Sequence, residues 1–388
     1  MRGVFYNFAQ NTPAVEYILI SGIFMALLIP ALLLAKQGKQ KSDYILSVYF
    51  LLFAATNLFS FIEIYNRSHN YPFPAFINSS TPLIFLHGPM LWLYIKSLTV
   101  NNFKLKPLHL LHITPFALIV LLFSVIIYSQ PVLFRIEADQ VNFRNHLSYP
   151  FVVAGIAIST QGYFIWGLLL LRNFNKKLRD WVSKTEGVDL QWLGFLIITA
   201  ITAYASISIL YAVDYRFGIL PLNLLQPAGF AIASGFVIVL GFFGLKQGNI
   251  FVALPKNALA EEIQPQPPIN QPLTDKDEKF VNDLITYMKT GKPFLDPELN
   301  ISKMAAELEV TVEYLSGILN GKLHMNFFDF VNRYRIEEFR RLCSDPKLNH
   351  LSIMGLAFDC GFNSKATFNR VFKKATNLTP SEFRQMSQ

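Results

Sequence analysis

Seven long apolar runs occupy most of the first 245 positions of this 388-residue chain, and they constrain its fold more than any other feature. Each run has, or nearly has, the roughly 20 residues that a helix needs to cross a bilayer. Charged residues inside the runs are confined to Glu16, Glu63 and Lys96, each near an end. A soluble helical core would carry charges at every turn, so the pattern predicts seven transmembrane helices. They span residues 15–35, 44–64, 82–98, 108–128, 151–171, 190–213 and 225–245.

The loops between these runs differ in their content of Lys and Arg, which are retained on the cytoplasmic side of a membrane. One alternate set of loops holds thirteen such residues: Lys36, Lys39, Lys41, Lys96, Lys104, Lys106, Arg172, Lys176, Lys177, Arg179, Lys184, Lys246 and Lys256. The other set holds five: Arg2, Arg67, Arg135, Arg144 and Arg216. This imbalance predicts that the N-terminus lies outside and that everything after the seventh run lies in the cytoplasm.

Polar side chains inside the apolar runs are the places to look for a sensor or transport site, because burying them in hydrocarbon costs free energy. They are Asn57, Glu63, His87, Gln161, Tyr163 and Gln226, and all but Tyr163 are taken as a candidate sensor site. The competing interpretation places Glu63 in the wet interface and gives the amides interhelical hydrogen bonds, and the sequence favours it.

No catalytic motif occurs in the chain, which lacks a nucleotide-binding loop, an H-E-x-x-H pair and a nucleophile elbow. His109 and His112 have a spacing that suits two metal ligands, but no cysteine or carboxylate lies nearby. The two cysteines, Cys343 and Cys360, are too few for a disulfide framework and are expected to be reduced and inert. We therefore predict a protein that is not an enzyme and has no catalytic residues, no metal and no cofactor.

The segment of residues 249–274 is a predicted linker. It contains Pro255, Pro265, Pro267, Pro268 and Pro272 among Gln, Asn and Ala residues. Such a segment has too little apolar content to pack, so it is predicted to be a partly extended linker in the cytoplasm. It divides the chain into a transmembrane sensor domain of residues 1–248 and a C-terminal domain of residues 275–388.

The C-terminal domain has the hydrophobic period of ordinary amphipathic helices and clear helix-start signals. Thr274, Asn300 and Asn326 are predicted N-caps, and Thr379 with Glu382 forms a predicted capping box around Pro380. These signals predict seven short helices and no strand. The fold class is therefore all-α: a polytopic seven-helix transmembrane bundle followed by a soluble seven-helix domain.

A degenerate repeat with an offset of 52 residues runs through this domain. Met304-Ala305 aligns with Leu356-Ala357, and Glu309-Val310 aligns with Gly361-Phe362. A small residue in the first helix and a tight turn at Gly361 let two helices cross closely, as a helix-turn-helix requires. The repeat predicts two helix-turn-helix units, at about residues 300–320 and 352–374.

At these positions the chain resembles a known family. The stretch GFNSKATFNRVFKKATNLTPSEFR, from Gly361 to Arg384, is similar to the C-terminal signature of AraC/XylS-type transcriptional regulators. The stretch KPFLDPELNISKMAAELEVTVEYLSGILN, which ends at Asn320, resembles the first half of the same domain. The resemblance implies sequence-specific binding of double-stranded DNA and control of transcription, with the domain coupled to a separate sensor. It covers only the C-terminal domain.

The resemblance also assigns roles by position in the two recognition helices. In the second, the base-edge candidates are Lys365, Ala366, Asn369 and Arg370, and the phosphate candidates are Lys373 and Lys374. These types fit, because Arg pairs bidentately with guanine and Asn with adenine, whereas Lys offers a point charge to phosphate. In the first recognition helix the corresponding positions are Glu313, Ser316 and Gly317, with Asn320 following.

Two positions depart from the family pattern. Gly317 stands where many members have a long polar or basic side chain, and glycine also weakens a helix. The first unit is therefore expected to read DNA loosely or through its backbone. Asn377 replaces the usual glycine before Thr379, a mild change because Asn tolerates the left-handed conformation.

Other prominent residues of the domain have simpler expected roles. Phe362, Phe368 and Phe372 are expected in the core, and Arg335, Arg340 and Arg341 on a solvated or phosphate-facing helix side. Basic residues outnumber acidic ones by ten to five in residues 333–388, but are outnumbered by ten to six in residues 275–332. The electrostatic attraction to DNA is therefore assigned to the second unit.

Together these features predict a membrane-embedded transcription regulator of a bacterial cytoplasmic membrane, which couples a membrane or extracytoplasmic signal to promoter binding. Its expected partners are double-stranded DNA, the lipid bilayer, RNA polymerase, a second copy of the chain and an unidentified small-molecule or membrane signal. One alternative is a polytopic transporter or membrane enzyme with a DNA-binding appendage, which the scarcity of intramembrane ionisable groups disfavours. Another is a receptor whose C-terminal domain binds only protein, which Arg370, Lys373 and Lys374 disfavour.

Overall fold

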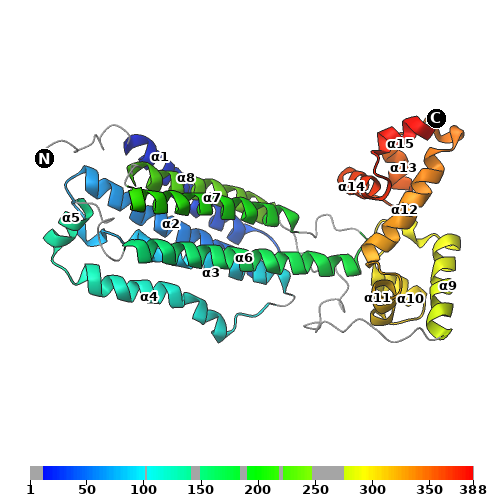
Figure 1. Cartoon of the computed structure of the whole chain (residues 1–388), viewed down its shortest axis with the longest axis horizontal. Helices are drawn as coiled ribbons and strands as arrows, with labels where there is room; N and C mark the ends of the chain where they lie inside the picture. The colour runs from blue at the N-terminus through cyan, green and yellow to red at the C-terminus, as the bar shows by residue number, and fades with distance from the viewer. Residues whose placement is uncertain are drawn as a thin grey trace. The chain divides into compact units, whose positions relative to one another are not determined.

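The computed structural model of the chain describes residues 12–100, 103–140, 149–183, 190–217, 222–246 and 275–387. The chain forms two compact units (Figure 1). The N-terminal unit contains residues 1–172 and 190–247, and the C-terminal unit contains residues 173–189 and 248–388. The predicted linker and Thr274 lie outside the described residues. Residues 173–183, which belong to the N-terminal domain predicted from the sequence, group with the C-terminal unit.

Long helices make up the N-terminal unit. In chain order they are α1 (Thr12–Ala35), α2 (Lys41–Ser68), α3 (Ser80–Thr99), α4 (Thr114–Phe123), the short α5 (Val132–Gln140), α6 (Tyr149–Trp181), α7 (Gln191–Phe217) and α8 (Leu222–Lys246). A 3₁₀ turn, Pro107–Ile113, precedes α4, and a π-helical turn, Ser124–Tyr128, follows it, so the helical run covers residues 107–128. Six of the described helical runs are long and apolar enough to cross a membrane, by length and composition.

The predicted third span, residues 82–98, falls within α3, which is absent from those six runs. Most of its residues are buried, including Trp92 and Tyr94, each 2% exposed. It packs against α2 and α4 inside the unit. A helix that packs mainly against other helices needs less lipid-facing surface than one at the outside of a bundle.

The outer surface of the N-terminal unit is apolar. Large side chains such as Phe151, Ile158 and Phe195 are at least 70% exposed. Apolar residues exposed at this density are unusual on a water-soluble surface and are typical of contact with lipid.

The C-terminal unit is built of short helices and two 3₁₀ turns, Pro293–Leu295 and Pro346–Leu348. The helices are α9 (Asp275–Thr290), α10 (Ile301–Glu307), α11 (Val312–Gly321), α12 (Phe327–Cys343), α13 (Ile353–Asp359), α14 (Lys365–Thr376) and α15 (Pro380–Ser387). Over the described part of the chain no strand forms, and a single antiparallel bridge joins Val182 to Asn300. The prediction of seven helices without strands in this domain is confirmed there, as is the all-helical class.

Helix caps in the C-terminal unit follow the sequence signals. The side chain of Asn300 accepts the backbone N–H of Lys303 at 3.0 Å, and that of Asn326 accepts the N–H of Asp329 at 2.8 Å. At the start of α15 the capping box is reciprocal: the Thr379 N–H donates to Glu382, and the Glu382 N–H donates to the Thr379 hydroxyl. Each such cap satisfies donors that the helix itself leaves unpaired.

Two hydrophobic cores lie in the C-terminal unit, and α12 contributes to both. Phe327, Phe330 and Val331 of α12 belong to the core beneath α9, α10 and α11. Phe339 and Cys343, further along α12, belong to the core beneath α13 and α14. The long helix therefore connects the two halves of the unit.

Candidate nucleic-acid interface

The two predicted helix-turn-helix units are α10 with α11 and α13 with α14. The first helices begin 52 residues apart, at Ile301 and Ile353, and the second helices begin 53 residues apart, at Val312 and Lys365. The sequence repeat therefore corresponds to a structural repeat, with one extra residue in the second turn.

Both turns use a residue in the left-handed conformation, at equivalent positions. Glu309 has φ of 54° and Gly361 has φ of 86°. A Cβ on Gly361 would lie 2.4 Å from the carbonyl oxygen of Phe294 and 3.0 Å from Nε of Arg335. Glycine is therefore required at position 361 for two reasons: the positive φ angle, and the close approach of this turn to the 3₁₀ turn at Pro293–Leu295.

The second recognition helix, α14, is amphipathic. Phe368 and Phe372 are fully buried, and the hydroxyl of Ser364 caps the helix by accepting the N–H groups of Ala366 at 3.2 Å and Thr367 at 3.4 Å. The residues assigned to DNA are all exposed on the other side: Lys365, Ala366, Asn369, Arg370, Lys373 and Lys374. The structure therefore presents all six on a solvent-accessible surface, as a major-groove reader requires.

Two of these basic residues contact the start of α12. Nζ of Lys374 lies 3.3 Å from a carboxylate oxygen of Asp329. The guanidinium of Arg370 lies 6.0 Å from the ring centre of Phe328. An exposed ion pair of this kind is worth at most about 1 kcal/mol, so a phosphate can compete for Lys374.

The first recognition helix, α11, presents a poorer surface. Glu313 and Asn320 are exposed, and Ser316 and Gly317 are half-buried. The Asn320 amide donates to the Ser316 hydroxyl at 3.3 Å. The helix has no basic side chain in its span.

Tyr314 of α11 is held from the side of α9. Its hydroxyl donates to Asp277 at 2.8 Å, and its ring packs edge-on against Phe280 with ring centres 5.0 Å apart. Burial and this hydrogen bond to the Asp277 carboxylate raise the pKa of Tyr314 to about 12. Tyr314 therefore fixes the position of α11.

The expectation for Arg335 was wrong. It is 2% exposed, and its Nε donates to the Phe294 carbonyl at 2.7 Å. Burial lowers the pKa of the guanidinium to about 10. Helical spacing did not reveal this, because the acceptors are backbone carbonyls far away in sequence. Arg340 and Arg341 are exposed as expected, and Arg341 pairs with Glu338 at 2.7 Å.

Both cysteines are free and buried. Burial raises the pKa of the Cys360 thiol to about 12, and it also raises the pKa of Cys343. Thiols in this state stay protonated at neutral pH and react slowly.

Among the candidate sensor residues whose side chains the structure describes, none forms a hydrogen bond with another. Both oxygens of Glu63 accept hydrogen bonds from Ser80, the first residue of α3, at 2.8 and 2.9 Å. The His87 ring lies 3.0 Å from the Thr56 hydroxyl, and the Gln161 amide donates to the Ile201 carbonyl at 3.2 Å. Glu63 therefore caps a helix.

Asn57 and Gln226 stand apart from the other sensor candidates. Asn57 is fully buried and neither end of its amide has a hydrogen-bond partner. Its amide nitrogen lies 2.6 Å from where a Cβ on Gly22 would stand, so a close crossing of α1 and α2 encloses it. The backbone of Gln226 is in α8, but its side chain lies outside the described residues.

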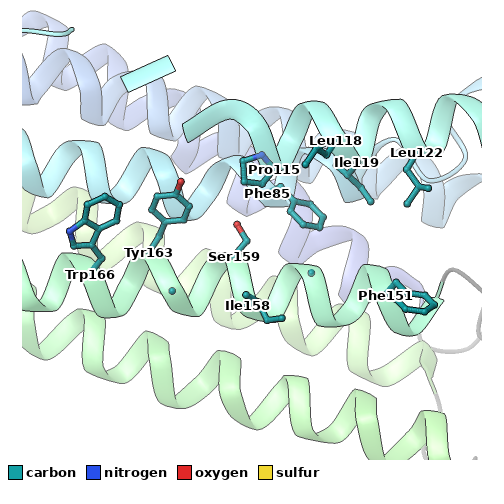
Figure 2. Close-up of a pocket in the computed structure, with 12 residues that line it drawn as sticks. Phe85, Pro115, Leu118, Ile119, Leu122, Phe151, Ile158, Ser159, Tyr163 and Trp166 are labelled. Carbon is teal, nitrogen blue, oxygen red and sulfur yellow. The ribbon is translucent and has the colours of Figure 1, made fainter. Parts of the chain in front are cut away.

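A pocket of about 480 Å³ opens between α4 and α6 (Figure 2). In chain order its lining residues are Phe85, Pro115, Leu118, Ile119, Leu122, Phe151, Gly155, Ile158, Ser159, Gly162, Tyr163 and Trp166. Tyr163 and Trp166 lie at one end and Phe151 at the other. The volume suits a small ligand, and none of the four candidate sensor residues whose side chains the structure describes lines the pocket.

Comparison with known proteins identifies a family model and several relatives that each match about a quarter of the chain. A family model described as a helix-turn-helix domain matches residues 304–386. No solved structure matches the chain.

Three relatives illustrate the match. The melibiose operon regulatory protein of Escherichia coli K12 is 28% identical over 93 residues, covering 24% of this chain and 30% of that protein. The probable transcription factor PqrA of Proteus vulgaris is 28% identical, covering 28% of this chain and 85% of that protein. Regulatory protein SoxS of Escherichia coli K12 is 26% identical, covering 28% of this chain and 94% of that protein. The chain thus spans less than a third of the melibiose regulator.

Two helix-turn-helix units joined by α12, with a polar and basic second recognition helix, define a DNA-binding domain. With these relatives, the C-terminal part of the chain is similar to AraC-type transcription regulators, as its sequence predicted.

Proposed function

We propose that the protein is a membrane-embedded transcription regulator, in which a transmembrane unit couples a membrane or extracytoplasmic signal to promoter binding. The observation that carries the proposal is the presence in one chain of an AraC-type domain and six apolar helical runs of membrane-spanning length. The apolar outer surface of the N-terminal unit supports the embedding. The buried α3 makes the seventh span, since it has 20 residues and packs among the other helices.

With seven spans, the distribution of basic residues supports an N-terminus outside and a C-terminal unit in the cytoplasm of a bacterial cytoplasmic membrane. This orientation gives the DNA-binding domain access to the chromosome. The remaining partners in the proposal are RNA polymerase, a second copy of the chain and the signal itself. The pocket between α4 and α6 is the site in the transmembrane unit where a small apolar signal would fit.

In the proposed complex, α14 lies in the major groove and carries most of the specificity. Arg370 reads guanine and Asn369 reads adenine, while Lys373 and Lys374 contact phosphates. The first helix-turn-helix unit binds next to α14 on the same duplex and makes few base-specific contacts. Its residues nearest the bases are Glu313, Ser316, Gly317 and Asn320.

The experiment is a pull-down of genomic DNA fragments with the full-length protein in lipid nanodiscs. We expect enrichment of a small set of promoter fragments, and loss of enrichment for R370A. The matched control is R333A, which removes an exposed arginine of α12 paired only with Glu337 of its own helix. Recovery of no specific fragment would contradict DNA recognition, and a periplasmic location of a C-terminal reporter would contradict the membrane topology.

A further inference from the structure

The end of α6 is part of the C-terminal unit. The helix begins at Tyr149 in the N-terminal unit, and from Asn173 onward it groups with the DNA-binding domain. The Trp181 side chain packs against the core beneath α9, α10 and α11. Val182 forms the antiparallel bridge with Asn300, the N-cap of α10. This short segment, residues 180–183, is called the docking segment below.

Buried polar contacts make the docking specific. The Ser183 hydroxyl donates to the Leu299 carbonyl at 2.5 Å, and the Asn332 amide donates to the Ser183 carbonyl at 3.2 Å. Nη2 of Arg335 lies 3.4 Å from the Ser183 hydroxyl. Ser183 and Asn332 are 1% exposed and Arg335 is 2% exposed. Hydrogen bonds in such surroundings fix one geometry, because any other leaves buried polar groups unpaired.

Arg335 links the docking segment to both helix-turn-helix units. Its Nη2 also donates to the Asp296 carbonyl at 2.8 Å, just before α10. Its Nε donates to the Phe294 carbonyl, the same oxygen that the turn at Gly361 approaches. One buried side chain therefore contacts the docking segment, the entry to the first unit and the turn of the second.

The docking segment also lies beside a residue that is assigned to DNA contact. Asp180, which is half-buried, lies beside Asn320 in the last turn of the first recognition helix, and this neighbour opposes the rise in pKa that burial gives the Asp180 carboxyl. Asn320 is one of the residues assigned to DNA. A carboxylate held at this point also repels the phosphate backbone, which carries one negative charge about every 1.7 Å along the duplex.

We propose that the DNA-binding domain carries a docking surface for residues 180–183, formed by Leu299, Asn300, Asn320, Asn332 and Arg335, and that the docked segment is autoinhibitory. The docking segment and promoter DNA compete for the first helix-turn-helix unit, so by linkage the binding of either one weakens the binding of the other. A signal that moves α6 releases the docking segment and raises the affinity for DNA. The inference rests on the proposed function, because it assumes that the domain binds promoters and that α6 belongs to the sensor.

The test locks the docking segment in place. The double variant V182C/N300C in the full-length protein brings two thiols to the positions of the antiparallel bridge, where Cα atoms stand close enough for a disulfide. The native thiols are buried and do not compete. The probe is a promoter duplex recovered by the pull-down, and the assay compares retardation by the oxidised and reduced forms in nanodiscs.

We expect the oxidised form to bind the duplex at least fivefold more weakly than the reduced form. Because both forms carry the same substitutions, loss of the Asn300 cap cancels in this comparison. As an independent variant, D180A should bind at least twofold more tightly than wild type, whereas N173A, at an exposed position of α6 before the docking segment, should not change the affinity.

Three outcomes would count against the proposal. Equal or tighter binding by the oxidised form would overturn autoinhibition and leave the proposed function standing. Failure of the disulfide to form in the full-length protein would overturn docking itself. Absence of retardation by both forms and by the wild type would overturn the proposed function as well.

Discussion

Substitution of Gly361 by alanine tests the fold of the DNA-binding domain most sharply. The new Cβ would occupy a left-handed backbone conformation, which costs about 1–2 kcal/mol for a non-glycine residue. It would also stand 2.4 Å from the Phe294 carbonyl, which cannot retreat freely because Arg335 donates to it. Overpacking against rigid neighbours costs a further ~1–3 kcal/mol.

A more restricted unfolded chain returns about 0.4–1 kcal/mol, so the net expected destabilisation by G361A is about 1–5 kcal/mol. A domain stable by only about 5–15 kcal/mol would lose a large part of its margin. The matched control is G355A in α13. There the gain in helix propensity, about 1 kcal/mol, is offset by a 3.2 Å contact with the Ser352 hydroxyl, and the net change should be near zero.

The assay is pulse proteolysis of the full-length protein in micelles across a urea gradient, followed through a C-terminal tag. The midpoint for G361A should fall well below that for wild type and for G355A. If G361A lies within about 1 kcal/mol of wild type, the turn does not have the described geometry.

The remaining predictions concern recognition and local stability. R370A should weaken promoter binding by about 1–3 kcal/mol in a retardation assay, and binding to random DNA much less. D329N should free Lys374 for phosphate, tightening binding at low salt and steepening the dependence of log K on log salt by about 0.9; an unchanged slope would refute this. S364A should cost about 1 kcal/mol of stability, measured by urea proteolysis, through loss of the α14 cap. Hydrogen bonding by neighbouring cations lowers the pKa of Glu338, so its stabilisation should be present above the ordinary pKa of about 4.3 and vanish as pH falls below it. The stability difference between wild type and E338Q should therefore shrink from pH 7 to pH 3.

Local signals in the sequence were sufficient for much of the C-terminal unit. The caps at Asn300, Asn326 and Thr379 depend on residues at most three positions apart, so their spacing alone predicts them. The repeat likewise located both turns, because a left-handed residue is needed at the same place in each. Apolar runs predicted the long helices, although α2 begins three residues earlier and ends four residues later than its run.

Contacts between distant segments could not be predicted in this way. The contact of Arg335 with Ser183 joins residues 152 positions apart, and nothing in the spacing of α12 distinguishes a buried arginine from an exposed one. Glu63 was a candidate sensor residue because it is charged, yet its position against the start of α3 gives it a capping role.

The shared helix α12 has a consequence for the promoters themselves. The helix has 17 residues and is about 26 Å long at 1.5 Å per residue, and it contributes side chains to both hydrophobic cores. One rigid helix therefore sets the distance between the two recognition helices. Because this distance is fixed, exchange of an individual base should weaken binding far less than an insertion between the two half-sites. DNA sites bound by this protein should therefore differ in base sequence but keep a constant spacing between half-sites. A single inserted base pair should lower the affinity for a promoter more than most single base substitutions.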